Sequence, residues 1–458
     1  MPQKLRQIQQ NLLEAPLYYV VIGTIAVCKR IPMMILRRVG KILGTLAFYT
    51  IADYRKTSLT NLALAFPHKP FHERYILAKE SLQHFMITIL ELLGIEKLIQ
   101  NIDSLISITT SSQQPEGFTS QEVLSDDGLK QTFQELEENK GVILFSGHQA
   151  NWELPFLFIT KNYSGLAFAK PIKNRKLSKK IFALREVFKG KIVEPKHGIH
   201  HAIEALRKGQ FVGIVGDQAL LMSPYAYSLF GSPAFTTTSP ALLAYKTGRP
   251  VIAITVYRRE QDYQVIPSPK FYADKNLPMK EAIKKLMDEL MTFLEKGIAC
   301  KPEQWLWIHK RWKRKLSPIV KKKYRYSHIL VIVVQASLPQ YMSFLEALAV
   351  CFSGATLTLA LQSSTHLQES QQNLSAYTSF TFRNFEDLLT LPNQFPAVFD
   401  LTDNSKQLHK HYKKTGSVAV YSKRSLEKKL PNSQASLEAA LQSFYDKKQR
   451  NPLLINKR

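Results

Sequence analysis

Apolar runs alternate with amphipathic stretches between residues 142 and 298, and this alternation constrains the fold more than any other feature. Short apolar runs predict strands at 142–145, 167–169, 191–193, 211–215, 251–257 and 263–266. Helical periodicity predicts helices at 177–188, 200–208, 239–247 and 277–298. Strands that alternate with helices are typical of a sheet covered by helices on both faces. We therefore predict an α/β fold for this region.

The hexapeptide His148-Gln149-Ala150-Asn151-Trp152-Glu153 follows the first of these predicted strands after a turn at Gly147. Catalytic groups of α/β folds commonly lie at strand ends. A histidine can take a proton from a hydroxyl, and a carboxylate can orient and stabilise the imidazolium. His148 and Glu153 converge only if the histidine lies in the loop and the glutamate in the next helix, for which Asn151 is a candidate cap. The alternative is a surface histidine beside a glutamate at a helix N-terminus.

Two more charged residues lie where they can join this site. Asp217 follows the predicted strand 211–215, in the same kind of position as His148. Arg185 lies on the helix that precedes strand 191–193. Their alternatives are a turn or cap residue for Asp217 and a solvent-facing side chain for Arg185. The three cysteines are far apart and have no metal-ligand spacing, so we predict no metal site.

The chain is strongly basic, with a formal net charge of +26. Nucleic acid, an anionic membrane surface or an acidic protein partner are all compatible with this charge. Residues 310–325 carry nine Lys or Arg and no acidic residue, and they follow Trp305 and Trp307 and include Trp312. Tryptophan beside basic residues suits the lipid headgroup layer, which favours a membrane-surface role over a solvated linker.

The N-terminal 55 residues alternate between apolar and basic segments. Lys29-Arg30 and Arg37-Arg38 interrupt the apolar runs, so no stretch reaches the ~18 uncharged residues of a clean membrane span. We predict helices that lie in the membrane interface, with Phe48, Tyr49 and Tyr54 at its boundary. A span with snorkelling basic residues and an amphipathic core helix remain alternatives.

The patterns divide the chain into four parts. We predict membrane-associating helices at 1–55, a large α/β domain at 56–315, a basic linker at 316–327 and a smaller α/β domain at 328–458. The last part contains apolar strand candidates at 329–334, 355–361, 397–400 and 417–421 and a helix at 338–352. It has no G-x-G-x-x-G or P-loop motif, and its role stays open, a sugar-related activity being one possibility.

A series of motifs in a fixed order identifies a family resemblance. They are Asn61 to Pro67, Gly147 to Glu153, Pro171-Ile172-Lys173-Asn174, Lys208 to Gly213, Asp217-Gln218, Phe230-Gly231, Thr236-Thr237-Thr238 and Pro302 to Lys313. Over about residues 15–315, this series resembles the late acyltransferases of lipid A biosynthesis, the lauroyl and myristoyl transferases of Gram-negative envelopes. These belong to the wider glycerolipid acyltransferase group.

The resemblance implies a glycerolipid-acyltransferase-like mixed sheet and an enzyme on the cytoplasmic face of the bacterial inner membrane. The enzyme would transfer a fatty acyl chain from acyl carrier protein to a hydroxyl of a Kdo-bearing acylated glucosamine disaccharide. His148 and Glu153 match the family's catalytic pair, and Arg185 and Asp217 match further site residues. Lys170 stands where the family often has arginine, which keeps the charge but loses the bidentate fork. Membrane lipids would be a partner, whereas nucleic acid, metals and further cofactors would not be needed.

The mechanism expected from these residues is direct attack without a covalent acyl-enzyme. His148 would deprotonate the acceptor hydroxyl, and Glu153 would hold the imidazole in the required tautomer. Arg185 would stabilise a phosphate or the oxyanion, and Asp217 would position Arg185 or the substrate. The alternatives are acyl transfer to another lipid, such as a glycerolipid or a mannosylated inositol lipid, and a non-enzymatic basic protein that binds membrane or nucleic acid.

Overall fold

The computed structural model describes residues 16, 18–172, 174–363, 374–402, 405–430, 432 and 434–445. The chain packs as two compact units. The first comprises Met1–Thr50, Lys79–Leu229 and Pro233–Leu306, and the second comprises Ile51–Ala78, Phe230–Ser232 and Trp307–Arg458. Residues 51–78 thus pack with the unit that contains the C-terminal region, although they are far from it in sequence.

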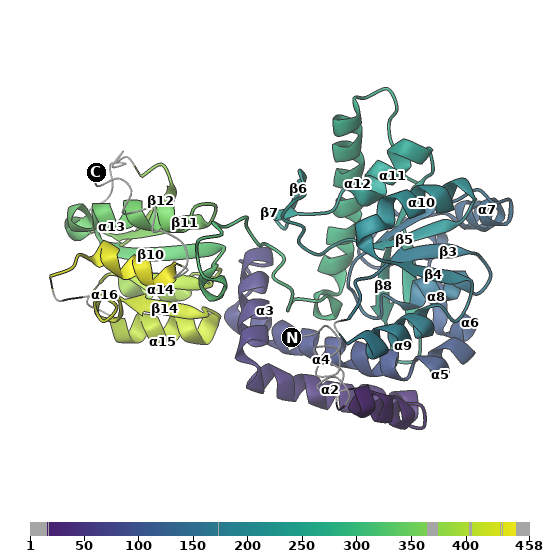
Figure 1. The fold of residues 1–458 in the computed structure, drawn as a ribbon, viewed down its shortest axis with the longest axis horizontal. Helices are drawn as coiled ribbons and strands as arrows, with labels where there is room; N and C mark the ends of the chain where they lie inside the picture. Colours follow the sequence, from purple (N-terminus) through teal and green to yellow (C-terminus); the bar gives the residue numbers. More distant parts are fainter. Residues whose placement is uncertain are drawn as a thin grey trace, which may run out of the picture. The chain divides into compact units, whose positions relative to one another are not determined.

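A seven-stranded sheet forms the centre of the first unit (Figure 1). In spatial order its strands are β1 (Ile106–Ile108), β9 (Tyr263–Pro267), β8 (Val251–Arg258), β2 (Ile143–Ser146), β5 (Phe211–Val215), β3 (Gly165–Phe168) and β4 (Gly190–Val193). All neighbouring pairs are parallel except β8 and β9, which are antiparallel. The predicted α/β fold with a mixed sheet is confirmed. A separate two-stranded sheet pairs β6 (Ala226–Leu229) with β7 (Ser232–Phe235).

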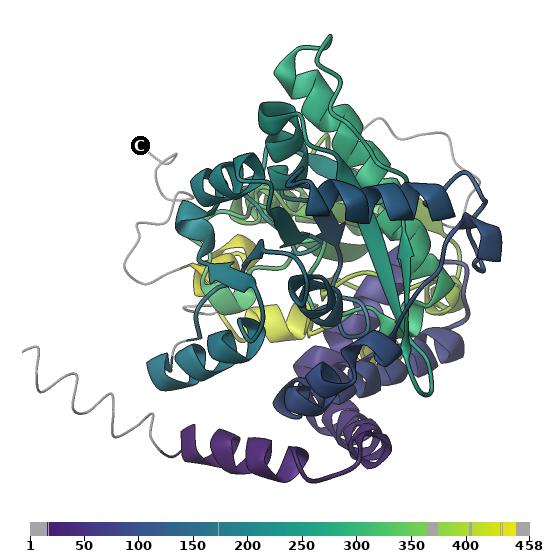
Figure 2. The same cartoon turned by 90° about the vertical axis from the view of Figure 1, so that its right-hand side faces the viewer.

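Helices cover both faces of this sheet (Figures 1 and 2). One face carries α8 (Leu154–Thr160) and α9 (Arg175–Arg185), near α5 (Ile95–Gln100) and α6 (Ile102–Leu105). Helix α7 (Asp126–Glu137) shares an apolar cluster with α8 and so lies on the same face. The other carries α10 (Gly198–Arg207), α11 (Ser239–Thr247) and α12 (Met279–Cys300). All residues of β2 and β8 are buried, as expected for central strands with both faces covered.

Two long helices pack closely near the N-terminus. Gly40 and Gly44 of α2 (Met33–Thr50) face α4 (Phe71–Leu93), and both belong to the buried side of α2. A Cβ at Gly44 would lie 2.3 Å from the Cα of Gln83, and one at Gly40 would lie 2.8 Å from the Cα of Ile87. The two backbones can approach this closely only because both positions lack a side chain. Among the described residues, no helix has the length and apolar character needed to cross a bilayer.

The second unit contains a five-stranded parallel sheet. Its spatial order is β12 (Tyr377–Phe382), β11 (Thr356–Gln362), β10 (His328–Val334), β13 (Ala397–Asp400) and β14 (Ala419–Ser422). The helices of this unit include α3 (Ala52–Ala65), α13 (Leu338–Cys351), α14 (Phe385–Thr390), α15 (Ser405–Thr415) and α16 (Lys423–Glu427). Separate apolar clusters include residues on the two faces of β10, so the C-terminal region is an α/β fold with its own core.

Several aromatic residues predicted to contact lipid are buried instead. Trp305, Trp307 and Trp312 are 2%, 0% and 2% exposed, and Phe48 on the inner side of α2 is 0% exposed. The indole of Trp312 donates to the carbonyl of Ser232 at 3.2 Å, so burial leaves its N–H satisfied. The prediction that these side chains lie in the headgroup layer is therefore wrong. Tyr49 remains exposed, as a boundary residue would be.

Candidate active site

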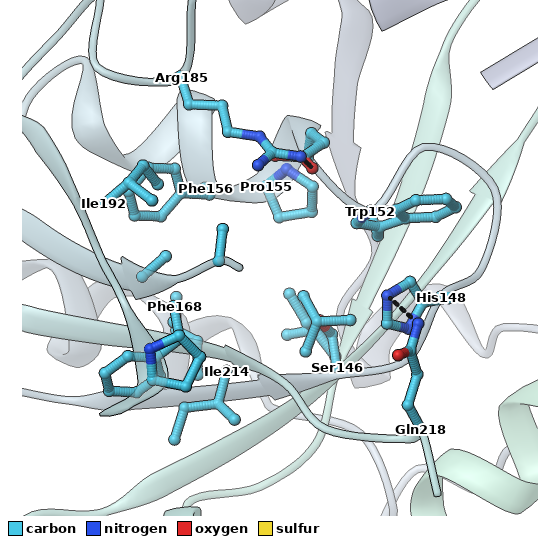
Figure 3. A pocket seen from close by; sticks show the side chains of 18 of the residues that line it. Ser146, His148, Trp152, Pro155, Phe156, Phe168, Arg185, Ile192, Ile214 and Gln218 are labelled. Atoms are coloured by element: carbon cyan, nitrogen blue, oxygen red, sulfur yellow. Dashed lines mark hydrogen bonds and ion pairs between the residues drawn. The ribbon is translucent and has the colours of Figure 1, made fainter. Parts of the chain in front are cut away.

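A cavity of about 360 Å³ lies between the sheet of the first unit and helix α8. His148, Glu153, Arg185 and Lys170 all line it, together with side chains from the strand ends of β2 and β5. Figure 3 shows His148 and Gln218 at one side of this cavity, and Phe156, Phe168 and Ile192 at the other. The fold therefore brings these four predicted site residues together around one cavity. The cavity is polar near His148 and apolar at its far side.

His148 is held by the carboxylate of Asp217, which is 3% exposed. Nδ1 of the imidazole lies 2.5 Å from Oδ1 of Asp217, and the backbone N–H of His148 donates to Oδ2 at 2.7 Å. The indole of Trp305 donates to the same Oδ2 at 2.7 Å. Burial alone would raise the pKa of Asp217, but the interaction with the His148 imidazole and these hydrogen bonds hold that pKa well below its usual range. Asp217 is therefore a fixed anion against one nitrogen of His148.

The approach of Asp217 to the backbone of His148 depends on Gly147. A Cβ at Gly147 would lie 2.9 Å from Oδ2 of Asp217 and 2.9 Å from Cδ1 of Leu294. This glycine is required for space, because its φ is not in the left-handed region. Ala150, further along the loop, does have a positive φ of 47°. Its backbone N–H donates to the carbonyl of Gln304 at 2.9 Å, so the surrounding structure holds this strained conformation.

The second imidazole nitrogen faces the cavity. Nε2 of His148 lies 3.2 Å from Nε2 of Gln218, and this amide nitrogen can only donate. A carboxylate on Nδ1 and an amide donor at Nε2 are both satisfied by the tautomer with its proton on Nδ1. Nε2 then has a lone pair that accepts hydrogen bonds and can accept a proton. Trp152, which packs against the imidazole with ring centroids 4.9 Å apart, lines the same cavity.

Glu153 pairs with Arg185, and no hydrogen bond or ion pair of the described residues joins it to His148. Glu153 is the N-cap residue of α8 and Arg185 is the last residue of α9, and their side chains form an ion pair beside the cavity. The glutamate and arginine side chains are 11% and 20% exposed. The structure therefore corrects two expected contacts. Asp217, not Glu153, orients the imidazole, and Glu153, not Asp217, holds Arg185.

The sequence of the chain matches a family model over residues 6–314, and the family is described as bacterial lipid A biosynthesis acyltransferase. The chain belongs to this family. The match confirms the resemblance seen in the motifs, which spans nearly the same residues. A comparison with curated proteins returned no match. Membership identifies the chain as an acyltransferase of lipid A biosynthesis, with a lipid A precursor as the acceptor class.

The sequence predicted that Asn151 caps helix α8, but Asn151 supports the acyltransferase site through a different contact. No side chain caps α8, and Nδ2 of Asn151 instead donates to Oε2 of Glu91 at 3.2 Å. Glu91 is fully buried and also binds Arg258, with Nη2 to Oε2 at 2.8 Å, and Arg37, with Nε to Oε1 at 2.9 Å. Burial would raise the pKa of Glu91, but the two arginines lower it, so the carboxylate is ionised. The loop is thus attached to α4, β8 and α2 through one anion.

Lys170 is exposed at the rim of the cavity, two residues after the end of β3. In the described part of the chain, no group of three or more His, Cys, Asp or Glu side chains could hold a metal ion. The residues that sequence reasoning missed are Gln218, the indole donor Trp305 and the buried Glu91. The parallel pairing of β2 with β5, with Ser146 opposite Val215, is what places Asp217 beside His148.

Proposed function

We propose that this acyltransferase moves a fatty acyl chain from the thioester of acyl carrier protein to a hydroxyl of a Kdo-bearing lipid A precursor, with His148 as the general base. One observation carries the proposal. His148 has a buried anion fixed against Nδ1 and presents Nε2 to a cavity with an apolar far side. This geometry suits removal of a proton from a hydroxyl beside a hydrocarbon-bearing substrate.

The reaction needs two proton transfers and no covalent enzyme intermediate. The acceptor oxygen attacks the thioester carbonyl carbon while its proton passes to Nε2 of His148. The tetrahedral intermediate collapses as the carbon–sulfur bond breaks, and the leaving thiolate takes the proton from the imidazolium. Asp217 stabilises that imidazolium between the two transfers. General base assistance of this kind typically contributes about 10²–10⁴-fold, and the chemistry requires no metal or organic cofactor.

Arg185 is the cationic group placed to stabilise negative charge in the cavity. Its guanidinium lines the cavity and is anchored by Glu153, so its position is fixed before substrate binds. In this proposal Glu153 is a positioning residue for Arg185. Lys170 at the rim is suited to a phosphate of the acceptor as a point charge. The carrier protein is acidic, and the strongly basic chain favours encounter with both substrates.

We place the enzyme at the cytoplasmic face of the inner membrane, and the outer face of α2 supports its contact with a membrane surface. Its exposed apolar side chains recur at helical spacing: Ile35, Val39, Ile42, Leu46 and Tyr49. Ile42 and Leu46 are 62% and 54% exposed, and the exposed basic residues Arg38 and Lys41 flank them. An apolar stripe bordered by cations matches the interface of an anionic bilayer.

Acidic substitutions in the exposed apolar stripe of α2 should release the enzyme from membranes. We expect Ile42→Asp combined with Leu46→Asp to weaken binding to vesicles containing anionic lipid by more than about 100-fold, since each buried aliphatic side chain contributes about 1.5–3 kcal/mol. Vesicle flotation measures this. Ile76→Asp, at an exposed isoleucine on α4, is the matched control and should bind as wild type does. Equal binding of the double variant and the control would exclude α2 as the membrane-contacting surface.

The proposed reaction is tested with membranes that contain the protein. Wild type and His148→Ala are incubated with Kdo-bearing tetraacyl lipid A precursor and acyl carrier protein thioesters, and products are weighed by mass spectrometry. We expect a single acyl mass increment that is absent with His148→Ala and unchanged with His201→Ala, at an exposed histidine on α10. An increment that survives His148→Ala would refute the mechanism. Product formed only on a glycerolipid or a mannosylated inositol lipid would refute the acceptor.

A further inference from the structure

The cavity beside His148 is a trough whose shape follows from the side chains on one face of the sheet. Gly213 on β5 is in register with Leu144 on β2 and with Ala167 on β3, and Ala167 is in register with Ile192 on β4. The two smallest residues of this row are therefore neighbours, between two large aliphatic ones. All four line the cavity. The missing side-chain volume at Gly213 and Ala167 creates the space under α8.

Strand β5 contributes a row of residues to the floor of the trough. Val215, Gly213 and Phe211 alternate with residues of the opposite face, and all three line the cavity. Val215 is in register with Ser146, which directly precedes the Gly147-His148 turn, so this end is the mouth. Phe211 lies about 13 Å further along the strand at ~3.3 Å per residue. Its ring contacts that of Phe156 edge-on, with centroids 5.7 Å apart, and both rings line the cavity at this end.

We propose that this trough holds the hydrocarbon chain of the acyl donor and that Gly213, with Ala167, determines the chain length it accepts. The inference rests on the proposed donor and adds the site of its acyl chain. A thioester carbonyl at His148 has its chain attached directly to the reacting carbon, so the chain must leave the mouth in a fixed direction. The free methyl end of a donor can enter the trough, whereas acceptor chains can remain in the bilayer.

A side chain at Gly213 would fill the trough without disturbing the backbone. A Cβ there would lie 3.5 Å from Cδ2 of Phe156 and 3.8 Å from Cβ of Ala167, which are ordinary van der Waals distances. The φ of Gly213 is not in the left-handed region, so other residues can adopt its conformation. Larger residues at this position therefore remove hydrocarbon-binding volume midway between the mouth and the Phe211–Phe156 end. This makes the position testable by substitution.

A second, smaller cavity lies beyond one wall of the trough. Its volume is about 60 Å³, and its lining is almost wholly apolar. Leu144, Pro155 and Ile254 line both cavities, so these three side chains form the partition. Shortening Leu144 would join the two spaces on the same face of the sheet. The trough can thus be shortened at Gly213 and enlarged at Leu144.

The test uses membranes containing the full-length protein, a fixed acceptor and saturated acyl carrier protein thioesters that increase by two carbons. We expect Gly213→Val and Ala167→Val to move the preferred donor about two carbons shorter. For the best wild-type donor, kcat/KM should fall about tenfold or more, because each methylene left unburied costs about fourfold. Short donors should react as with wild type. Leu144→Ala should move the preference toward longer donors, and thermal unfolding of every variant checks the fold.

A control variant and the pattern of activity across donors distinguish failure of this inference from failure of the proposed function. Ala226→Val, at an exposed position on β6, should leave the donor profile unchanged. An unchanged profile in both Gly213→Val and Ala167→Val, or an equal loss for all donors in folded protein, would overturn the inference while leaving the proposed function intact. A shift in preference among acceptors of different chain length, with the donor fixed, would also overturn it. Absence of transfer by wild type with any donor would instead refute the proposed function.

Discussion

Asp217→Asn should lower kcat by about 100- to 10,000-fold and leave KM nearly unchanged. The amide can place its N–H₂ against Nδ1 of His148, which stabilises the tautomer with the proton on Nε2, and that nitrogen then cannot act as the base. The corresponding change in the serine protease triad costs about 10⁴ in kcat for the same reason. Asp217 is buried and holds the imidazole through Oδ1, so water cannot replace its charge. Steady-state kinetics with acyl carrier protein thioesters measures the effect.

Glu153→Gln is the comparison that separates the two carboxylates. It leaves the His148–Asp217 contact intact and weakens the anchor of Arg185, so we expect a smaller loss than with Asp217→Asn. Addition of His148→Ala to Asp217→Asn should cause little further loss, because the two residues act as one unit. A larger effect of Glu153→Gln than of Asp217→Asn would assign the orienting role to Glu153 after all. Circular dichroism confirms that each variant is folded.

The sequence predicted the cavity residues and most of the strands because both are encoded locally, but it missed the strands β1, β6, β7 and β12, whose residues form no apolar run of comparable length. Buried strands appear as apolar runs, and strand ends are where α/β folds place polar groups. The partner of His148 was not encoded locally. Residues 148 and 217 meet only because β2 pairs with β5, and strand order is a long-range property of the fold. The spacing of His148 and Glu153 suggested a pair, but a glutamate at the start of α8 instead meets the end of α9.

The tryptophans show that residue composition is also a limited guide to where a side chain lies. Trp305 stands in a basic, aromatic segment that resembles a lipid-contacting sequence, yet its indole is buried and donates to Asp217. Composition cannot separate a membrane anchor from a core residue, because an amphipathic indole suits both places. On helix α2, in contrast, the spacing of the residues does carry this information. There, helical spacing separates the exposed Ile42 from the buried Phe48, and only the pairing of Gly40 and Gly44 with α4 decides which face is outward.

Glu91→Gln should destabilise the first unit by about 3–5 kcal/mol, the usual cost of removing one partner from a buried ion pair. The side chain of Arg258 is 4% exposed, so the substitution leaves a guanidinium without its carboxylate and without water. Arg37 and Asn151 lose the same acceptor. At about 2–4 °C per kcal/mol, the apparent Tm should fall by roughly 10 °C. Thermal unfolding in detergent measures this shift.

The pH dependence of the Tm tests whether the ionised carboxylate of Glu91 is the cause of this loss of stability. Because the pKa of Glu91 is lowered in the folded protein, its contribution to stability is complete above the usual carboxylate range. That contribution disappears only as the pH falls through the lowered value, where wild type must protonate a buried group. The Tm difference between wild type and Glu91→Gln should therefore be constant near neutral pH and shrink in strong acid.

Glu204→Gln, which removes an exposed ion pair with Lys208, should change stability by less than about 0.5 kcal/mol. A comparable Tm shift in both variants would show that Glu91 acts as an ordinary surface charge and does not attach α2 and β8 to the catalytic loop.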